Sequence, residues 1–351
     1  MAENVKYLPN MHKDFVHDIS FNLYGNRLAT CSSDSNIRIY DLQESGVWKQ
    51  TSVLPVSPTA GPVLRLCWAH PEFGVIIATA TFDRFVNVWE EVPASLSDSE
   101  LYATKWVNKG PLCDLASTYN TVAIKFAPKH LNLILAIAFY DGIVRFYDFT
   151  DGEGRIKEEI QTKMSCLNCL SWSTARYHLP TVLAIGSDDC NSTGNKLQLW
   201  EYDMNRKAIK VEQTIAMTDT IKDLQFAQNF GQSYHLLAVA SHCIQLVTIK
   251  PQKKEPNDLK ASVYEFRIIS TLDDHGSTVW RVSFNVFGSV LYSCGDDGRV
   301  RQFKGSTNNG PWICINTVQT DGSMIPTHEK PITESNRTDI SSNESITTKS
   351  E

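Results

Sequence analysis

Cys166 and Cys169 form a C-x-x-C pair, the spacing that often supplies two of the four ligands of a structural zinc site. The missing ligands would have to come from His178 and Cys190, the only nearby candidates, which lie in different predicted turns. Free cysteine usually behaves as a small buried apolar residue. We therefore interpret the pair as two small residues on and beside a strand, and we predict no metal site.

His12 and His275 could act as general bases in a hydrolytic reaction. A catalytic histidine also needs a nucleophile placed beside it. The sequence contains no G-x-S-x-G, P-loop, H-E-x-x-H or G-x-G-x-x-G motif that would provide one. Because the two histidines occupy the same place in two related stretches of the chain, we predict that they are structural. We expect no catalytic activity and no cofactor.

Adjacent acids and a basic cluster are the remaining groups with chemical potential. The pairs at 188–189 and 273–274 could attract a divalent cation, but acids in turns are usually solvated. Lys125, Lys129 and His130 lie close together near a predicted strand end. Single-stranded nucleic acid is bound by longer basic grooves with several exposed aromatic rings. We therefore predict no metal at the acids and no direct nucleic-acid contact at the cluster.

Composition excludes several classes of protein. The chain has 351 residues, 42% of them hydrophobic, which is enough for a sizeable core, and a net charge of −6, which disfavours long-range attraction to nucleic acids or anionic membranes. No run of about 18 apolar residues exists, so we expect no insertion into a membrane. The N-terminus lacks the apolar region of a secretion signal. The odd count of 9 cysteines then predicts reduced thiols in the cytosol or nucleoplasm.

An internal repeat links the two ends of the chain. The stretch ATCSSDSNIRIY at 29–40 resembles YSCGDDGRVRQF at 292–303, and the match extends upstream to His12 and His275 at a constant offset of 263. The recurring marker is an Asp followed six residues later by an aromatic residue, as in Asp34–Tyr40, Asp83–Trp89, Asp141–Tyr147 and Asp297–Phe303.

Six copies of this unit account for most of the chain. The fourth copy ends at Trp200 and carries an insertion at 190–195, and the fifth, near 240–247, has lost both the Asp and the aromatic residue. Each copy contains alternating apolar residues bounded by Gly, Pro or Asn, which is typical of β-strands. Four short antiparallel strands repeated six times predict an all-β fold, a six-bladed β-propeller.

The repeat boundaries predict three regions and an open ring. Residues 12–320 would form the propeller, 1–11 an N-terminal extension, and 321–351, rich in Ser and Thr and without aromatic residues, a disordered tail. Each predicted blade is complete within its own repeat, so no strand remains to lock the first blade to the last. We therefore expect a seam between blades one and six that a partner completes by adding strands in trans.

The aromatic–acid dipeptides that end four of the repeats, such as Trp89-Glu90 and Trp200-Glu201, resemble the Trp-Asp signature of the WD-repeat family. That resemblance implies a network within each blade, in which an Asp in the turn before the third strand orients a His at the blade entrance, followed by Ser or Thr and then Trp. Phe303 lacks a hydroxyl and would truncate the last network. The residues implied are His12, Asp34, Tyr40, Asp83, Trp89, Asp141, Tyr147, Trp200, His275 and Asp297.

Longer strings narrow the resemblance. WAHPEFG at 68–74 is similar to the small coat-type propellers shared by COPII vesicle coats and the nuclear pore. FAPKHL at 126–131 and VWRVSFN at 279–285 are similar to the Seh-type WD-repeat nucleoporins within that group. A COPII-type coat subunit is the alternative that this resemblance leaves open.

The Seh-type resemblance implies a non-catalytic scaffold subunit in the outer ring of the nuclear pore complex. Its open propeller would be completed by a blade from a helical scaffold nucleoporin, beside other subunits of the Y-shaped subcomplex. It would support nucleocytoplasmic transport of mRNA and protein. The resemblance also implies a place in the GATOR/SEA assembly that regulates TOR. We therefore expect the protein at the nuclear envelope, in the cytoplasm and at the vacuole or lysosome surface.

Overall fold

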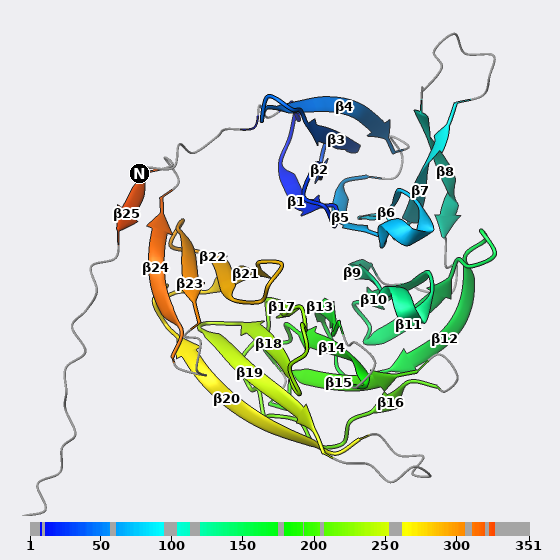
Figure 1. Cartoon of the computed structure of the whole chain (residues 1–351). Coiled ribbons are helices and arrows are strands. Elements are labelled where there is room, and N and C mark those ends of the chain that lie inside the picture. The colour runs from blue at the N-terminus through cyan, green and yellow to red at the C-terminus, as the bar shows by residue number, and fades with distance from the viewer. Residues whose placement is uncertain are drawn as a thin grey trace, which may run out of the picture.

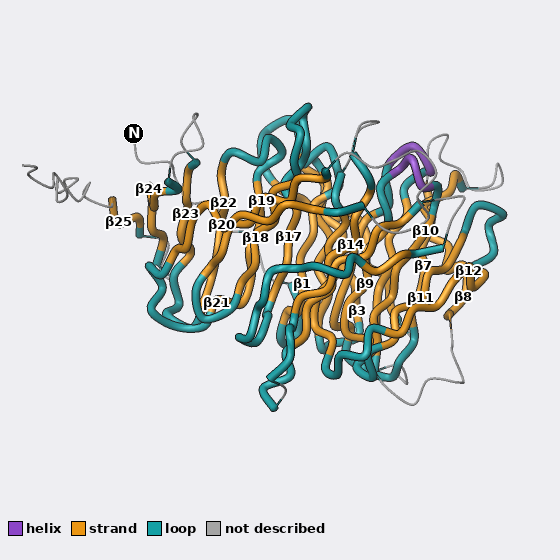
Figure 2. The backbone as a smooth tube through the Cα atoms, turned by 90° about the horizontal axis from the view of Figure 1, so that it is seen from below, coloured by secondary structure: helices purple, strands orange, loops and turns teal. Residues whose placement is uncertain are grey.

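The computed structural model describes residues 8, 11–56, 61–94, 104–112, 120–174, 179–191, 193–203, 207–252, 262–305, 311–319 and 323–326. They form six antiparallel sheets arranged as the blades of a propeller, which confirms the predicted fold class (Figure 1). In the view of Figure 2 the strands cross the disc between its two surfaces. Two single-turn 3-10 helices, η2 (Pro71–Phe73) and η3 (Lys129–Leu131), lie in turns between strands.

Each of the first three blades is one complete repeat. Blade one comprises β1 (Val16–Phe21), β2 (Arg27–Ser32), β3 (Asn36–Leu42) and β4 (Trp48–Pro55). Blade two comprises β5 (Val63–Trp68), β6 (Ile76–Thr81), β7 (Val86–Pro93) and β8 (Thr104–Leu112). Blade three comprises β9 (Thr121–Phe126), β10 (Ile134–Phe139), β11 (Ile143–Asp148) and β12 (Arg155–Gln161).

The last three blades follow the same order. Blade four comprises β13 (Leu167–Trp172), β14 (Thr181–Ser187), β15 (Leu197–Tyr202) and β16 (Ile209–Lys210). Blade five comprises β17 (Asp223–Phe226), β18 (His235–Ala240), β19 (Ile244–Pro251) and β20 (Tyr264–Leu272). Blade six comprises β21 (Val279–Phe284), β22 (Val290–Gly295), β23 (Val300–Lys304), β24 (Ile313–Val318) and β25 (Met324–Pro326).

The fifth strand of blade six corrects one sequence prediction. β25 pairs antiparallel with β24, so the sheet extends past residue 320, where we expected the propeller to end and a disordered tail to begin. Three tail residues can join the sheet because β24 would otherwise be an unpaired edge with free backbone groups. Most of the N-terminal extension and the remainder of the tail lie outside the described residues.

The hydrophobic core is divided between the blades. The described residues form five clusters of buried side chains, and each cluster joins one blade to the next, from blades one and two through to blades five and six. Alternation along the strands produces this arrangement, because successive side chains face opposite neighbours. None of the five clusters of described residues joins blade six to blade one.

Candidate interaction site on the first and last blades

The structure brings His12, Asp34 and Tyr40 together at the entrance of blade one. His12 Nδ1 lies 3.0 Å from Asp34 Oδ2, and His12 Nε2 lies 2.8 Å from Thr30 Oγ1, whose side chain also hydrogen-bonds Tyr40. Burial acts to raise the pKa of Asp34, but hydrogen bonds from Lys13 N and from His12 hold it below its ordinary value. The carboxylate therefore stays ionised and fixes the turn between β2 and β3.

Blade six contains the equivalent pair. His275 Nδ1 lies 2.8 Å from Asp297 Oδ1, and His275 Nε2 lies 2.7 Å from Ser293 Oγ. Arg301 also donates to Asp297. Burial raises the pKa of Asp297, but the hydrogen bonds from Arg301 and His275 outweigh burial and lower it. The fully buried Phe303 stands where blade one has a tyrosine, so the chain of polar contacts ends earlier here.

The other predicted network residues are not joined to an entrance histidine in the contacts that the described residues make. Trp89 Nε1 donates to Thr79 Oγ1 over 3.4 Å, and Trp200 Nε1 donates to Gln198 Oε1 over 3.3 Å. Asp141 accepts a hydrogen bond from Ile143 N, and the Asp83 carboxylate lies beside Gly61. Tyr147 is buried in the core between blades two and three.

Several of the cysteine, acidic and basic residues that the sequence offered as candidate metal-binding, catalytic or nucleic-acid-binding groups are buried or form ion pairs. Burial raises the pKa of Cys169, which is the direction of an unreactive thiol. Asp188 accepts a bond from the Lys222 ammonium at 2.6 Å, and Lys129 pairs with Glu72 at 3.3 Å. The part of the chain that the structure describes contains no group of three or more His, Cys, Asp or Glu side chains that could hold a metal ion. None of its helices is long and apolar enough to cross a membrane.

Blade one exposes the sheet face that points away from blade two. Side chains directly opposite on neighbouring strands share a face, so Ile19 lies beside Thr30, and Phe21 lies beside Leu28. Ile19 is 59% exposed and Phe21 is 54% exposed. Val282, which the repeat offset equates with Ile19, is only 5% exposed because blade five covers it. Ile19 and Phe21 are therefore exposed apolar residues at the inner strand of this face, whereas Leu28 and Tyr40 farther out on it are buried.

Blade six exposes its opposite face. Val300 lies opposite Cys294 on β22 and is 43% exposed, and Tyr292 on the same face is 41% exposed. Ile37, which the repeat offset equates with Val300, is 0% exposed because it packs against blade two. The two uncovered faces belong to the first and the last blade, the ends of the series in Figure 1.

A polar group on the blade-one face also lacks a partner. Arg38 lies opposite Thr30, and its Nη1 donates to Gln50 Oε1 over 2.7 Å. Its Nε is buried and has no hydrogen-bond partner among the described residues. In blade four the equivalent residue, Gln198, donates its Nε2 to the Thr162 carbonyl at the end of blade three over 2.7 Å. In blade four this position therefore reaches the preceding blade, whereas in blade six the equivalent Arg301 bonds Asp297 of its own blade.

One ion pair links the inner strands of the two end blades. Arg281 on β21 lies 3.8 Å from Asp18 on β1, and these residues are equivalent in their repeats. Asp18 also accepts a bond from Leu66 N in blade two, as Asp223 of blade five does from Val282 N in blade six. An acid at this position thus binds the next blade. Arg38, Asp18 and Arg281 were not predicted as functional residues from the sequence, although the constant offset between equivalent repeat positions points to Asp18 and Arg281.

Comparisons with known proteins agree with this geometry. The family model described as "WD domain, G-beta repeat" matches residues 5–41, which include β1 and β2 of blade one, and residues 266–304, which run from β20 of blade five to β23 of blade six. The chain is 40% identical to "Nucleoporin SEH1" of Bos taurus and of Homo sapiens over 323 residues, which cover 90% of this chain and 88% of each relative. It is 37% identical to "Nucleoporin SEH1" of Danio rerio over 90% of this chain and 87% of that relative.

Proposed function

The chain belongs to the SEH1 nucleoporin family of WD-repeat propellers, and from this we propose that it is a scaffold subunit of the nuclear pore. The family is structural and not catalytic. Its relatives are named for the nuclear pore, so we place this protein there with other pore subunits as partners. A rigid disc of packed sheets suits that role, because it can present fixed surfaces to several neighbours.

We propose further that a partner chain inserts strands between blades one and six. The observation that carries this proposal is the contrast between equivalent residues, since Ile37 is 0% exposed and Val300 is 43% exposed. Ile19 and Val282 show the reverse contrast on the other face. One additional blade from the partner would cover both faces. It would pack against blades one and six in the same way as consecutive blades pack against each other within the chain.

The energetics favour such an insertion. Full burial of one exposed Ile, Val or Phe side chain contributes about 1.5–3 kcal/mol. Several such side chains on two faces would outweigh the entropic cost of ordering a short segment of the partner. Backbone hydrogen bonds would add affinity where an added strand meets a sheet edge. The buried Nε of Arg38 would donate to a carbonyl of the inserted blade, as Gln198 does within the chain.

The identity of the partner rests on the family resemblance. We infer a helical scaffold nucleoporin of the Y-shaped subcomplex that donates the blade, in support of mRNA and protein transport. The relatives reported above are named nucleoporins, which favours the pore over a COPII-type coat. The GATOR/SEA role in TOR regulation, with its cytoplasmic and vacuolar pools, stays a prediction. We also propose that the His–Asp and aromatic residues of the WD pattern are blade scaffolding.

Affinity purification of the tagged chain tests the proposal. Ile19→Asp and Val300→Asp place a charge on either exposed face, so each should abolish recovery of the helical nucleoporin detected by mass spectrometry. Ile156→Asp is the matched control, because Ile156 is a similarly exposed apolar residue on β12, remote from both faces. Equal recovery with all three variants would refute the seam as the binding site. Recovery of coat subunits in place of nucleoporins would refute the assignment to the pore.

A further inference from the structure

One residue of each blade, directly after the second strand, lies near the centre of one surface of the disc. In every blade but the fifth, the backbone N–H of this residue donates to the carbonyl of the residue before the inner strand, as Tyr140 N does to the Asn120 carbonyl over 3.1 Å. The first strands of the blades border the centre of the ring in Figure 1, so these positions form a rim around it. The rim residues are Ser33, Phe82, Tyr140, Asp188, Ser241 and Asp296.

Blades two and three carry aromatic residues at this rim. Phe82 and Tyr140 stand where blades one and five have Ser33 and Ser241, and their side chains are 52% and 49% exposed. The fold does not require a ring at this position, because Ser33 makes the same backbone hydrogen bond in blade one. Exposed aromatic residues on neighbouring blades are typical of a surface that another molecule contacts.

Side-chain contacts continue this surface from blade three into blade four. The Tyr140 side chain hydrogen-bonds that of Cys166, the residue before the inner strand of blade four. The Cys166 carbonyl in turn accepts the bond from Asp188 N over 2.9 Å. The exposed ring of Tyr140 therefore lies beside a rim residue that is a carboxylate.

The rim already holds one cation in the other half of the ring. The Lys222 ammonium donates to Asp188 over 2.6 Å and lies 4.8 Å from the centre of the Trp280 ring. An ammonium over an indole face is a favourable cation–π arrangement, and the carboxylate adds a charged hydrogen bond. Trp280 Nε1 donates to the exposed Asp296 over 2.5 Å, and this neutral donor leaves the negative charge of Asp296 unbalanced. Basic side chains thus suit the chemistry of the rim.

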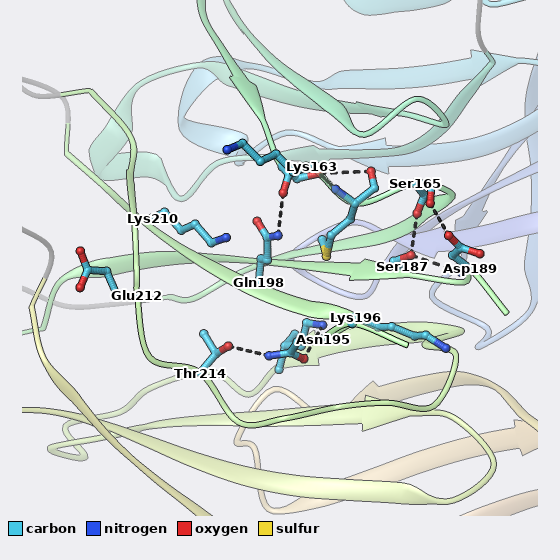
Figure 3. Close-up of a pocket in the computed structure, with 14 residues that line it drawn as sticks. Lys163, Ser165, Ser187, Asp189, Asn195, Lys196, Gln198, Lys210, Glu212 and Thr214 are labelled. Atoms are coloured by element: carbon cyan, nitrogen blue, oxygen red, sulfur yellow. Dashed lines mark hydrogen bonds between the residues drawn. The ribbon is translucent and has the colours of Figure 1, made fainter. Parts of the chain in front are cut away.

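Further carboxylates follow the rim residues directly in the turns of blades two, three and four. They are Asp83, Asp141 and Asp189. Figure 3 shows the one in blade four, where Asp189 accepts a hydrogen bond from Ser165 Oγ and is held in place by it. Of the basic residues in these three turns, Lys196 is buried and Arg84 is exposed. Acids therefore outnumber exposed basic groups beside Phe82 and Tyr140, which favours a positively charged ligand.

We propose that this rim docks a linear segment of a partner protein in which a Lys or Arg side chain is flanked by apolar ones. Phe82 and Tyr140 contact the apolar side chains, and the basic side chain pairs with the carboxylates of the adjoining turns. The same acids repel the phosphates of a nucleic acid. Phe82 and Tyr140 belong to blades two and three, which do not border the seam, so this docking is separate from the insertion of a blade between blades one and six.

A positional peptide array probed with the tagged full chain tests the docking site. Peptides with a central Lys or Arg flanked by Leu or Phe should retain the chain, and the same peptides with a central Glu should not. The tightest Arg-centred peptide is then titrated by fluorescence anisotropy. Tyr140→Ser and Phe82→Ser introduce the residue type of blades one and five, and each should weaken binding about tenfold or more. Ile156→Ser is the matched control, because Ile156 is a similarly exposed apolar residue on β12 of blade three, and it should bind as wild type.

Thermal unfolding establishes beforehand that each variant is folded at the temperature of the titration. Recovery of the pore partner through the seam should be the same for Tyr140→Ser and wild type, so failure of the rim and failure of the seam are distinguishable. The proposal is overturned if no peptide retains the chain, if Glu-centred peptides bind as well as Arg-centred ones, or if both serine variants at the rim bind as wild type. An equal loss of binding in Ile156→Ser would also overturn it, since the contact would then not lie at the rim.

Discussion

His235, at the start of β18, shows how burial alters a single residue. Its side chain is buried between blades four and five, and its Nε2 lies 3.1 Å from the Pro180 carbonyl oxygen. Burial disfavours the charged imidazolium and lowers the pKa of His235 to about 4, although the bond to Pro180 acts in the opposite direction. The neutral ring can donate one hydrogen to the carbonyl, and a second proton would place an unpaired charge in the core.

This burial predicts a specific loss of stability in mild acid. The unfolded chain takes up a proton near pH 6.5, but the folded chain resists it until about pH 4. Between these values the unfolded state binds more protons, so stability present above pH 6.5 is lost as the pH falls towards 4. The full effect is about 3 kcal/mol, of which about 2 kcal/mol should be gone near pH 5.

His235→Gln keeps a donor for the Pro180 carbonyl and removes the titrating group. Urea unfolding at neutral pH and near pH 5 should therefore show a smaller loss of unfolding free energy in the variant than in the wild type. His17→Gln is the control, because His17 is exposed on blade one. If wild type and His235→Gln lose equal stability over this range, His235 does not carry the acid sensitivity.

At the scale of the element, the strands were predictable but their covered faces were not. Period-two alternation located the inner strands of the six blades, because a half-buried sheet requires it. The exposure of a sheet face depends on whether another blade packs against it. Ile37 and Val300 have similar side chains at equivalent repeat positions, yet Ile37 is buried and Val300 is exposed. β25 was missed because three residues in a polar tail carry too short a pattern.

A matched pair of substitutions tests whether the two faces differ as the structure describes. Ile37→Ala removes a side chain from the core between blades one and two and should cost about 2–5 kcal/mol of unfolding free energy. Val300→Ala shortens an exposed side chain and should cost less than about 0.5 kcal/mol in the isolated chain. Urea unfolding of both variants provides the comparison. Similar losses would mean that another part of the chain covers Val300 and that the seam is closed from within.

At the scale of the whole molecule, the six blades are held together unequally. Five junctions contain buried apolar clusters, and these span the ring from blade one to blade six. The contact between the ends that the structure describes is the Arg281–Asp18 pair at 3.8 Å, and the Arg281 side chain is 41% exposed. An exposed pair of this kind contributes about 0–1 kcal/mol and weakens with salt. The end blades should therefore separate at low cost.

This inequality predicts a gradient of local stability around the ring. Hydrogen exchange followed by mass spectrometry should show β1 and β24 exchanging about tenfold or more faster than β13, which corresponds to about 1.4 kcal/mol of local opening. β13 is the internal reference because its blade has a core cluster on both sides. Binding of the proposed partner should slow exchange in β1 and β24 and leave β13 unchanged, since only the end blades would gain a neighbour. Equal protection of all three strands in the isolated chain would mean that the ring closes without a partner, and the exposed faces would then need another explanation.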